Sequence, residues 1–163
     1  MKVLYSGILK AVIDPTEPDG FFIGDIRTCL DNMPIPSYSP PLGCLWPVVG
    51  QAPRLPEEKW HVTLIHQSIL KPYKQQLKGM EFPVPPRLPA ITECTFGWRE
   101  SGGEGDYRRS FVLWFPNPYQ QQLKAYVRIC MLMLGVDEGD PEPDRRFHIS
   151  IANLTGKPKD SVR

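Results

Sequence analysis

The sequence predicts an α+β domain, because stretches with the two-residue alternation of β-strands are mixed with one long stretch of helical periodicity. The helical stretch runs from Pro118 to Leu134, where apolar residues recur three and four positions apart. A proline is acceptable in the first turn of a helix, and Gly135 lies just past the end, where glycine is typical. The 163 residues are most simply a single domain, residues 1–163.

The other predicted elements are short and are bounded by turn residues. Strand patterns lie at residues 4–13, 21–26, 90–98 and 109–115. The last two flank a glycine-rich segment, residues 101–106, and therefore predict a β-hairpin. For residues 26–33, periodicity does not decide between an extension of the strand at residues 21–26 and a turn of helix. Residues 70–80 have the composition of a short helix, and the polar tail from Thr155 is expected at the surface.

A proline-rich loop is predicted over residues 34–56. Seven prolines in this stretch remove backbone donors and restrict the residues before them to extended shapes. The stretch also contains large apolar side chains, including Trp46, that are unfavourable to leave in water. We therefore expect a loop that packs over the domain as a rim of the functional site.

The composition limits the partners. A formal net charge of +1 provides no global basic field, which disfavours binding along duplex DNA. The four cysteines are scattered, without a C-x-x-C pair, and the N-terminus has no signal-peptide pattern, so we expect a cytoplasmic protein. No apolar run approaches the roughly 18 to 20 residues that span a bilayer, so no membrane partner is expected. The sequence does not indicate an oligomeric state.

Two tetrapeptides with the same pattern carry the functional signal: His61-Val62-Thr63-Leu64 in the middle of the chain and His148-Ile149-Ser150-Ile151 near its end. In a strand, successive side chains point to opposite faces. Each tetrapeptide therefore predicts a strand with an apolar face for the core and an opposite face that offers an imidazole beside a hydroxyl. The chain has only three histidines, and two of them stand in this pattern.

If the two strands meet, His61, Thr63, His148 and Ser150 form a catalytic group. One imidazole, neutral near pH 7, accepts a proton while the other, charged, donates one, as cleavage of a phosphodiester requires. The two hydroxyls donate hydrogen bonds to the non-bridging phosphoryl oxygens. This arrangement requires no metal and no cofactor. His66 lies five residues from His61, so strand parity puts it on the opposite face unless the strand bends.

Two aromatic residues, Tyr5 and Trp98, are candidates for stacking on a base, although both are equally suited to the core. Arg108, Arg109, Arg145 and Arg146 are candidates to pair with a phosphate, but arginine pairs in loops are more often solvated.

The paired motifs resemble the H-x-[T/S]-x motifs of the 2H phosphoesterase superfamily, and the resemblance covers roughly residues 60–153. It implies a two-lobed α+β fold with antiparallel sheets, a central cleft lined by the motif strands and helices on the outside. The chain differs before the first motif, where the early helix of that family is not evident and the proline-rich stretch stands instead. The N-terminal strand with Tyr5 and the approach from Leu55 to Trp60 are similar to the phage anti-CBASS group, which would place the protein in the host cytoplasm.

The resemblance implies a metal-independent phosphodiesterase of the 2H type. Its expected substrates are cyclic oligonucleotide signals, 2′-5′ linked oligonucleotides or RNA ends with a 2′,3′-cyclic phosphate. The sequence does not apportion the acid and base roles between the two histidines. The alternative is a nucleotide-binding sponge or an RNA-binding module that uses the same cleft without turnover.

Overall fold

The computed structural model of the chain describes residues 1–32, 53–102 and 107–162, and within these ranges it has one open, six-stranded antiparallel sheet. The mixed α+β class predicted from the sequence is confirmed. The strand order is β1-β2-β3-β6-β5-β4, with every neighbouring pair antiparallel. The strands are β1 (Lys2–Tyr5), β2 (Leu9–Val12), β3 (His61–Ile65), β4 (Thr95–Ser101), β5 (Arg108–Trp114) and β6 (His148–Asn153).

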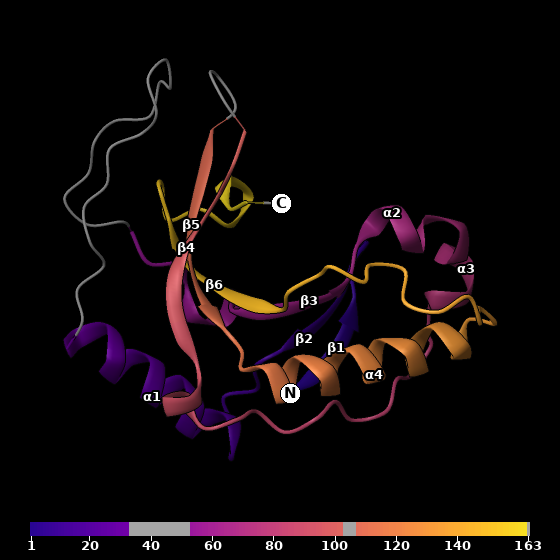
Figure 1. Cartoon of the computed structure of the whole chain (residues 1–163), viewed down its shortest axis with the longest axis horizontal. Coiled ribbons are helices and arrows are strands. Elements are labelled where there is room, and N and C mark those ends of the chain that lie inside the picture. The colour runs from indigo at the N-terminus through magenta and orange to yellow at the C-terminus, as the bar shows by residue number, and fades with distance from the viewer. Residues whose placement is uncertain (33–52, 103–106, 163) are drawn as a thin grey trace.

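Two long helices accompany the sheet, α1 (Asp19–Asn32) and α4 (Asn117–Met133) (Figure 1). The chain therefore passes twice through the same order, first β1-β2-α1-β3 and then β4-β5-α4-β6. The last strands of the two halves, β3 and β6, lie side by side at the centre of the sheet. The shorter elements are α2 (Gln67–Leu70), α3 (Lys74–Leu77) and the 3-10 turns η1 (Glu57–Lys59), η2 (Lys71–Tyr73), η3 (Ile91–Glu93) and η4 (Pro158–Asp160).

The hydrophobic core is shared by both halves. The apolar residues of the two motif strands are buried in it: Val62, Leu64, Ile149 and Ile151 are each at most 1 % exposed. They belong to one cluster with apolar side chains of α1 and α4. Burial of such a side chain contributes roughly 1.5–3 kcal/mol. Because strand residues alternate, the histidines and hydroxyl residues of the same strands are directed to the face opposite the core.

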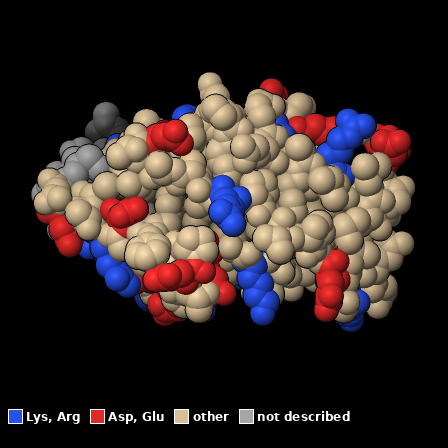
Figure 2. Space-filling view, turned by 90° about the horizontal axis from the view of Figure 1, so that it is seen from below, with Lys and Arg blue, Asp and Glu red and all other residues tan. Residues whose placement is uncertain are grey.

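The lower face of the molecule has mixed charge. Figure 2 views the molecule from below Figure 1 and shows scattered acidic and basic side chains on a face that is otherwise mostly uncharged. In the described ranges, no helix combines the length and the apolar character needed to cross a membrane.

The first half of the chain differs from the sequence-based prediction. The predicted single strand over residues 4–13 is a hairpin of β1 and β2, which turns at Gly7 with a φ of 88°. A residue with a side chain rarely adopts this φ, so glycine permits the turn.

The predicted strand at residues 21–26 is wrong, because these residues belong to α1. Phe22, Ile26 and Leu30 are buried at four-residue intervals, whereas Phe21 is 63 % exposed. The open segment 26–33 is helical as far as Asn32. An early helix, α1, therefore does precede the first motif, which corrects the expectation that this helix is absent.

Two of the elements predicted after the first motif are present in the structure. The helix predicted from Pro118 is confirmed as α4, and the predicted hairpin is confirmed as β4 and β5. The helix predicted at residues 70–80 is replaced by α2, η2 and α3, with Pro72 in the middle of the run. Most of the predicted proline-rich loop lies outside the described residues. Its end is described, and there Leu55 is buried and Arg54 bridges to Ala152 of β6.

Candidate active site

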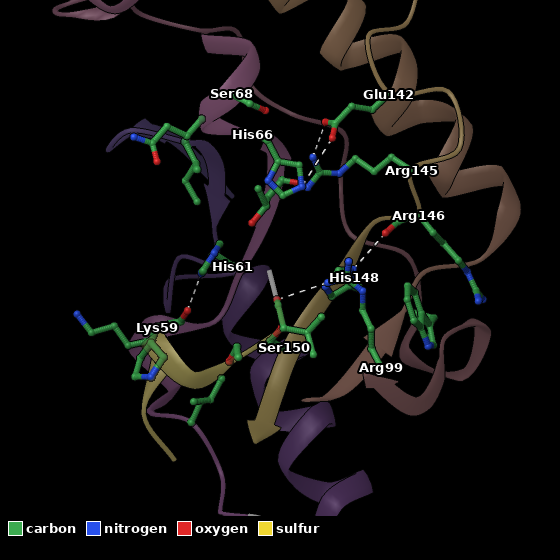
Figure 3. Close-up of a pocket in the computed structure, with 18 of the residues that line it drawn as sticks. Lys59, His61, His66, Ser68, Arg99, Glu142, Arg145, Arg146, His148 and Ser150 are labelled. Atoms are coloured by element: carbon green, nitrogen blue, oxygen red, sulfur yellow. Dashed lines mark hydrogen bonds and ion pairs between the residues drawn. The ribbon is translucent and has the colours of Figure 1, made fainter. Parts of the chain in front are cut away.

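A pocket of about 990 Å³ opens on the face of β3 and β6 opposite the core. This volume is at the upper end of the range, roughly 300–1,000 Å³, that is typical of small-molecule sites. His61, Thr63, His148 and Ser150 all line it, as predicted from the two motifs. Figure 3 shows His61 and His148 on opposite sides of the pocket, with Ser150 between them.

The pairing of the two motif strands sets the relative places of these four residues. Val62 of β3 is the ladder partner of Ile149 of β6. In an antiparallel register, this pair places His61 next to Ser150 and Thr63 next to His148. Each imidazole thus has the hydroxyl residue of the other motif as its neighbour across the strands.

The two imidazoles are oriented in the same way. Nδ1 of His61 lies 2.8 Å from the carbonyl oxygen of Lys59, and Nδ1 of His148 lies 3.1 Å from the carbonyl oxygen of Arg146. A carbonyl oxygen only accepts, so in both rings Nδ1 carries the hydrogen and donates it. Nε2 is then the nitrogen of each ring that is available to a ligand, and in the neutral ring it is a proton acceptor.

Burial makes both rings weak bases. Desolvation lowers the pKa of His61, and the nearby ammonium of Lys10 lowers it further. Desolvation lowers the pKa of His148 to about 4, and the guanidinium groups of Arg99 and Arg145 and the ring of His61 add to this effect. Both imidazoles are therefore neutral near pH 7.

Each motif strand contains a β-bulge at the same place. The partners of β2 step from Thr63 to Ile65, and the partners of β5 step from Ser150 to Ala152. The extra residue inverts the alternation beyond it. His66 therefore returns to the pocket face and lines the same pocket as His61, which corrects the parity-based prediction that put it on the opposite face. Nε2 of His66 lies 3.7 Å from Oε1 of Glu142, and burial lowers the pKa of this imidazole.

The pocket is lined by more cations than anions. The basic side chains are Lys59, Arg99, Arg145, Arg146 and Lys159, and the acidic ones are Glu142 and Asp144. Arg145 is only 11 % exposed. Its Nη2 donates to the carbonyl oxygen of Thr63 at 2.6 Å, and its Nη1 donates to Oε2 of Glu142 at 2.7 Å. This guanidinium ties the segment before β6 to β3 and leaves a positive wall next to the motif residues.

The predicted phosphate-binding arginines divide into two groups. Arg145 and Arg146 line the pocket, whereas Arg108 and Arg109 are not among its lining residues. Arg108 instead donates from Nη1 to the carbonyl oxygens of Lys159 and Ser161 in the C-terminal tail. The tail was expected at the surface. Residues 157–159 are exposed, as expected, but the end of the described tail also forms part of the pocket wall, where Val162 is only 8 % exposed.

The predicted stacking residues, Tyr5 and Trp98, lie outside the pocket lining. Tyr5 packs against the core cluster. The ring of Trp98 packs edge-to-face on Phe111 at 5.1 Å and lies under the guanidinium of Arg109. Among the described residues, the aromatic ring that lines the pocket beside the two motifs is that of Trp114, which sequence reasoning missed. In the sequence, Trp114 could be recognised only as a residue near the end of a predicted hairpin strand. Its position in the pocket depends on the pairing of β5 with β6, which the sequence alone does not assign.

Gln120 of α4 was also missed. This side chain is buried, and its amide forms both hydrogen bonds with the main chain of Phe147, accepting from N–H at 2.7 Å and donating to C=O at 2.8 Å. It also donates to the carbonyl oxygen of Phe115 at 3.2 Å. The residue immediately before His148 is therefore fixed by a helix of the same half.

Across the described ranges, no group of three His, Cys, Asp or Glu side chains is placed to hold a metal ion. Comparison of the chain with protein-family models, with curated proteins and with solved structures found no match. The functional interpretation rests on the two motifs and on the geometry of the pocket.

Proposed function

We propose that the protein is a cytoplasmic, metal-independent phosphodiesterase of the 2H type that acts on small nucleotides. The proposed substrates are cyclic oligonucleotide signals, 2′-5′ linkages and 2′,3′-cyclic phosphate ends of RNA. One observation carries the proposal: the histidine and the hydroxyl residue of both motifs line one pocket. The repeated ββαβ order also supports the two-lobed 2H fold as the finer description of the architecture.

The proposed reaction moves one proton through each imidazole. Nε2 of a neutral ring removes the proton from the attacking oxygen, which is a neighbouring 2′-hydroxyl or a water molecule. A new P–O bond forms as the old one breaks, and Nε2 of the other, protonated ring donates a proton to the leaving oxygen. Thr63 and Ser150 donate hydrogen bonds to the non-bridging oxygens, where negative charge grows. Exchange with solvent then restores the starting protonation of the two rings.

The charges around the two rings favour one assignment of roles. Arg99 and Arg145 act on His148, whereas Lys10 is the cation that acts on His61. His148 is therefore the proposed base and His61 the proposed acid. A bound phosphate raises the pKa of a nearby imidazole because its negative charge stabilises the protonated form. Substrate binding thus favours the protonated form of one ring, which the lowered pKa values disfavour near pH 7.

The test is a panel of candidate substrates incubated with the protein in EDTA and analysed by mass spectrometry. The panel contains cyclic di- and trinucleotides, 2′-5′ oligoadenylate and RNA with a 2′,3′-cyclic phosphate end. We expect turnover without added metal, and a loss of roughly 10²–10⁴-fold in His61→Ala and in His148→Ala, both folded by circular dichroism. Turnover that survives both substitutions refutes the mechanism, and a loss in EDTA that Zn²⁺ restores indicates a metal enzyme instead.

A second candidate is a nucleotide-binding sponge or an RNA-binding module. The observation in its favour is that the cationic pocket contains imidazoles with lowered pKa, so it attracts anions without holding a proton donor. The same panel separates the two functions. Recovery of an unchanged ligand from a tight complex supports the binding module and rejects the enzyme.

A further inference from the structure

Trp114 makes the two sides of the pocket unequal. It is the ladder partner of His148, and the corresponding partner of His61 on the other half is Val12. Trp114 lines the pocket, whereas Trp60 and Trp98 belong to the core cluster or pack against it. Among the described residues, an aromatic surface thus lies beside the imidazole of His148, whereas the ladder partner of His61 is aliphatic.

The indole of Trp114 is held in a defined place. A Cβ atom at Gly97 would lie 3.3 Å from its Nε1 and 3.6 Å from its Cδ1, so the absence of a side chain on the neighbouring strand makes room for the ring. The ring centroid of His148 lies 5.0 Å from that of the indole, at an interplanar angle of 59°. The guanidinium carbon of Arg146 lies 4.3 Å from the centroid of the indole, over its face.

Arg146 belongs to the segment that leads into β6, and it is exposed. Figure 3 shows it on the same side of the pocket as His148. A guanidinium over an indole forms a cation–π pair, and both groups are planar. Arginine planes and aromatic rings are the two kinds of surface on which proteins stack nucleobases.

We infer that Trp114 and Arg146 form a base-binding subsite for the nucleoside attached to the phosphate at His148. This inference rests on the proposed function, because it takes the ligand to be a nucleotide. The base stacks on the planar surface of the pair while its phosphate meets the hydroxyl groups and cations of the motif strands. Stacking depends on the area of the ring and not on a hydrogen-bond pattern, so the subsite accepts every base and prefers purines.

Binding of AMP and of ribose 5-phosphate to the wild-type protein, measured by calorimetry, tests the subsite. Both ligands carry a phosphate monoester, which the proposed activity does not cleave, and only AMP carries a base. We expect tighter binding of AMP. Trp114→Ala should weaken AMP binding by about 5- to 150-fold and leave ribose 5-phosphate binding unchanged. Trp114→Phe should retain most of the AMP affinity.

A second variant moves the indole without removing it. Gly97→Ala places a methyl group against the ring, so it should weaken AMP binding selectively, while Trp98→Phe, outside the pocket lining, should have no effect. Equal affinity of the wild-type protein for AMP and ribose 5-phosphate overturns the subsite. An equal effect of Trp114→Ala on the binding of both ligands also overturns it. So does the absence of AMP binding at millimolar concentration. Because the measurement needs no turnover, base-selective binding in an inactive protein rejects the phosphodiesterase and supports the subsite.

Discussion

Acid should destabilise the fold through His148. The pKa of this imidazole is lowered to about 4 in the folded protein, from 6.5 when it is free in water. Below pH 6.5 the unfolded chain therefore gains a proton that the folded chain does not accept. The free energy of unfolding then falls as the pH is lowered, and the fall is complete once the pH is below the folded pKa.

The magnitude follows from the two pKa values. Between pH 7 and pH 5, this one titration lowers the free energy of unfolding by about 2 kcal/mol, and below pH 4 the loss reaches about 3 kcal/mol. Asp14 and Glu57 also have lowered pKa values in the folded protein, and their stabilisation is lost in acid as well. A comparison with His148→Gln removes these contributions, because both carboxyl groups remain in the variant.

The assay is urea unfolding of the wild-type protein and of His148→Gln at pH 7 and at pH 5. The loss of stability between the two pH values should be about 2 kcal/mol smaller in the variant. His66→Gln is the matched control, because His66 is 40 % exposed and should contribute much less. Equal pH dependence of the wild type and His148→Gln, within about 0.5 kcal/mol, refutes the reasoning. An NMR titration that places the pKa of His148 near 6.5 refutes it too.

Three further predictions concern the pocket and the side chains that support it. The kcat/KM of the active substrate should have a bell-shaped pH profile with both apparent pKa values below 6.5, because the active form holds one proton on two imidazoles whose pKa values are lowered. An optimum above pH 7.5 would contradict it. Gln120→Leu should lower the free energy of unfolding by about 3 kcal/mol in urea titrations, since it leaves buried main-chain groups of Phe147 unpaired; a loss below about 1 kcal/mol argues against a stabilising role of these hydrogen bonds. Arg145→Met should cost about 1–3 kcal/mol by the same measurement, because it leaves the carbonyl oxygen of Thr63 and the carboxylate of Glu142 without their donor. Wild-type stability in this variant would show that the bridge is dispensable.

The sequence predicted the elements whose pattern is local and strong. The motif strands were found because polar and apolar residues alternate in them, and α4 was found because its seventeen residues repeat a helical period. The run at residues 21–26 is too short for its period to be decided. It is a helix because Phe22, Ile26 and Leu30 pack into the core. That packing depends on tertiary contacts, which the local sequence does not specify.

The site was predictable only in part, for a related reason. The four motif residues could be found because each motif contains its own alternation. The return of His66 to the pocket depends on a bulge against β2, and the place of Trp114 depends on the pairing of β5 with β6. Both are properties of strand register, which two separate segments of the chain determine together. A single stretch of sequence does not specify them.

The two halves of the chain repeat the same backbone arrangement around His61 and His148, but they place different charged residues near the two rings. Because β3 and β6 share their bulge and their carbonyl contact at Nδ1, both rings present Nε2 in the same way. Because Arg99 and Arg145 act on His148 while Lys10 acts on His61, the two rings differ in their affinity for a proton. An acid–base pair needs both properties, a common orientation toward one phosphate and unequal proton affinities. Two halves with identical neighbours would supply only the common orientation. The differences between the halves therefore support the proposed division of labour, in which His148 accepts the proton and His61 donates it.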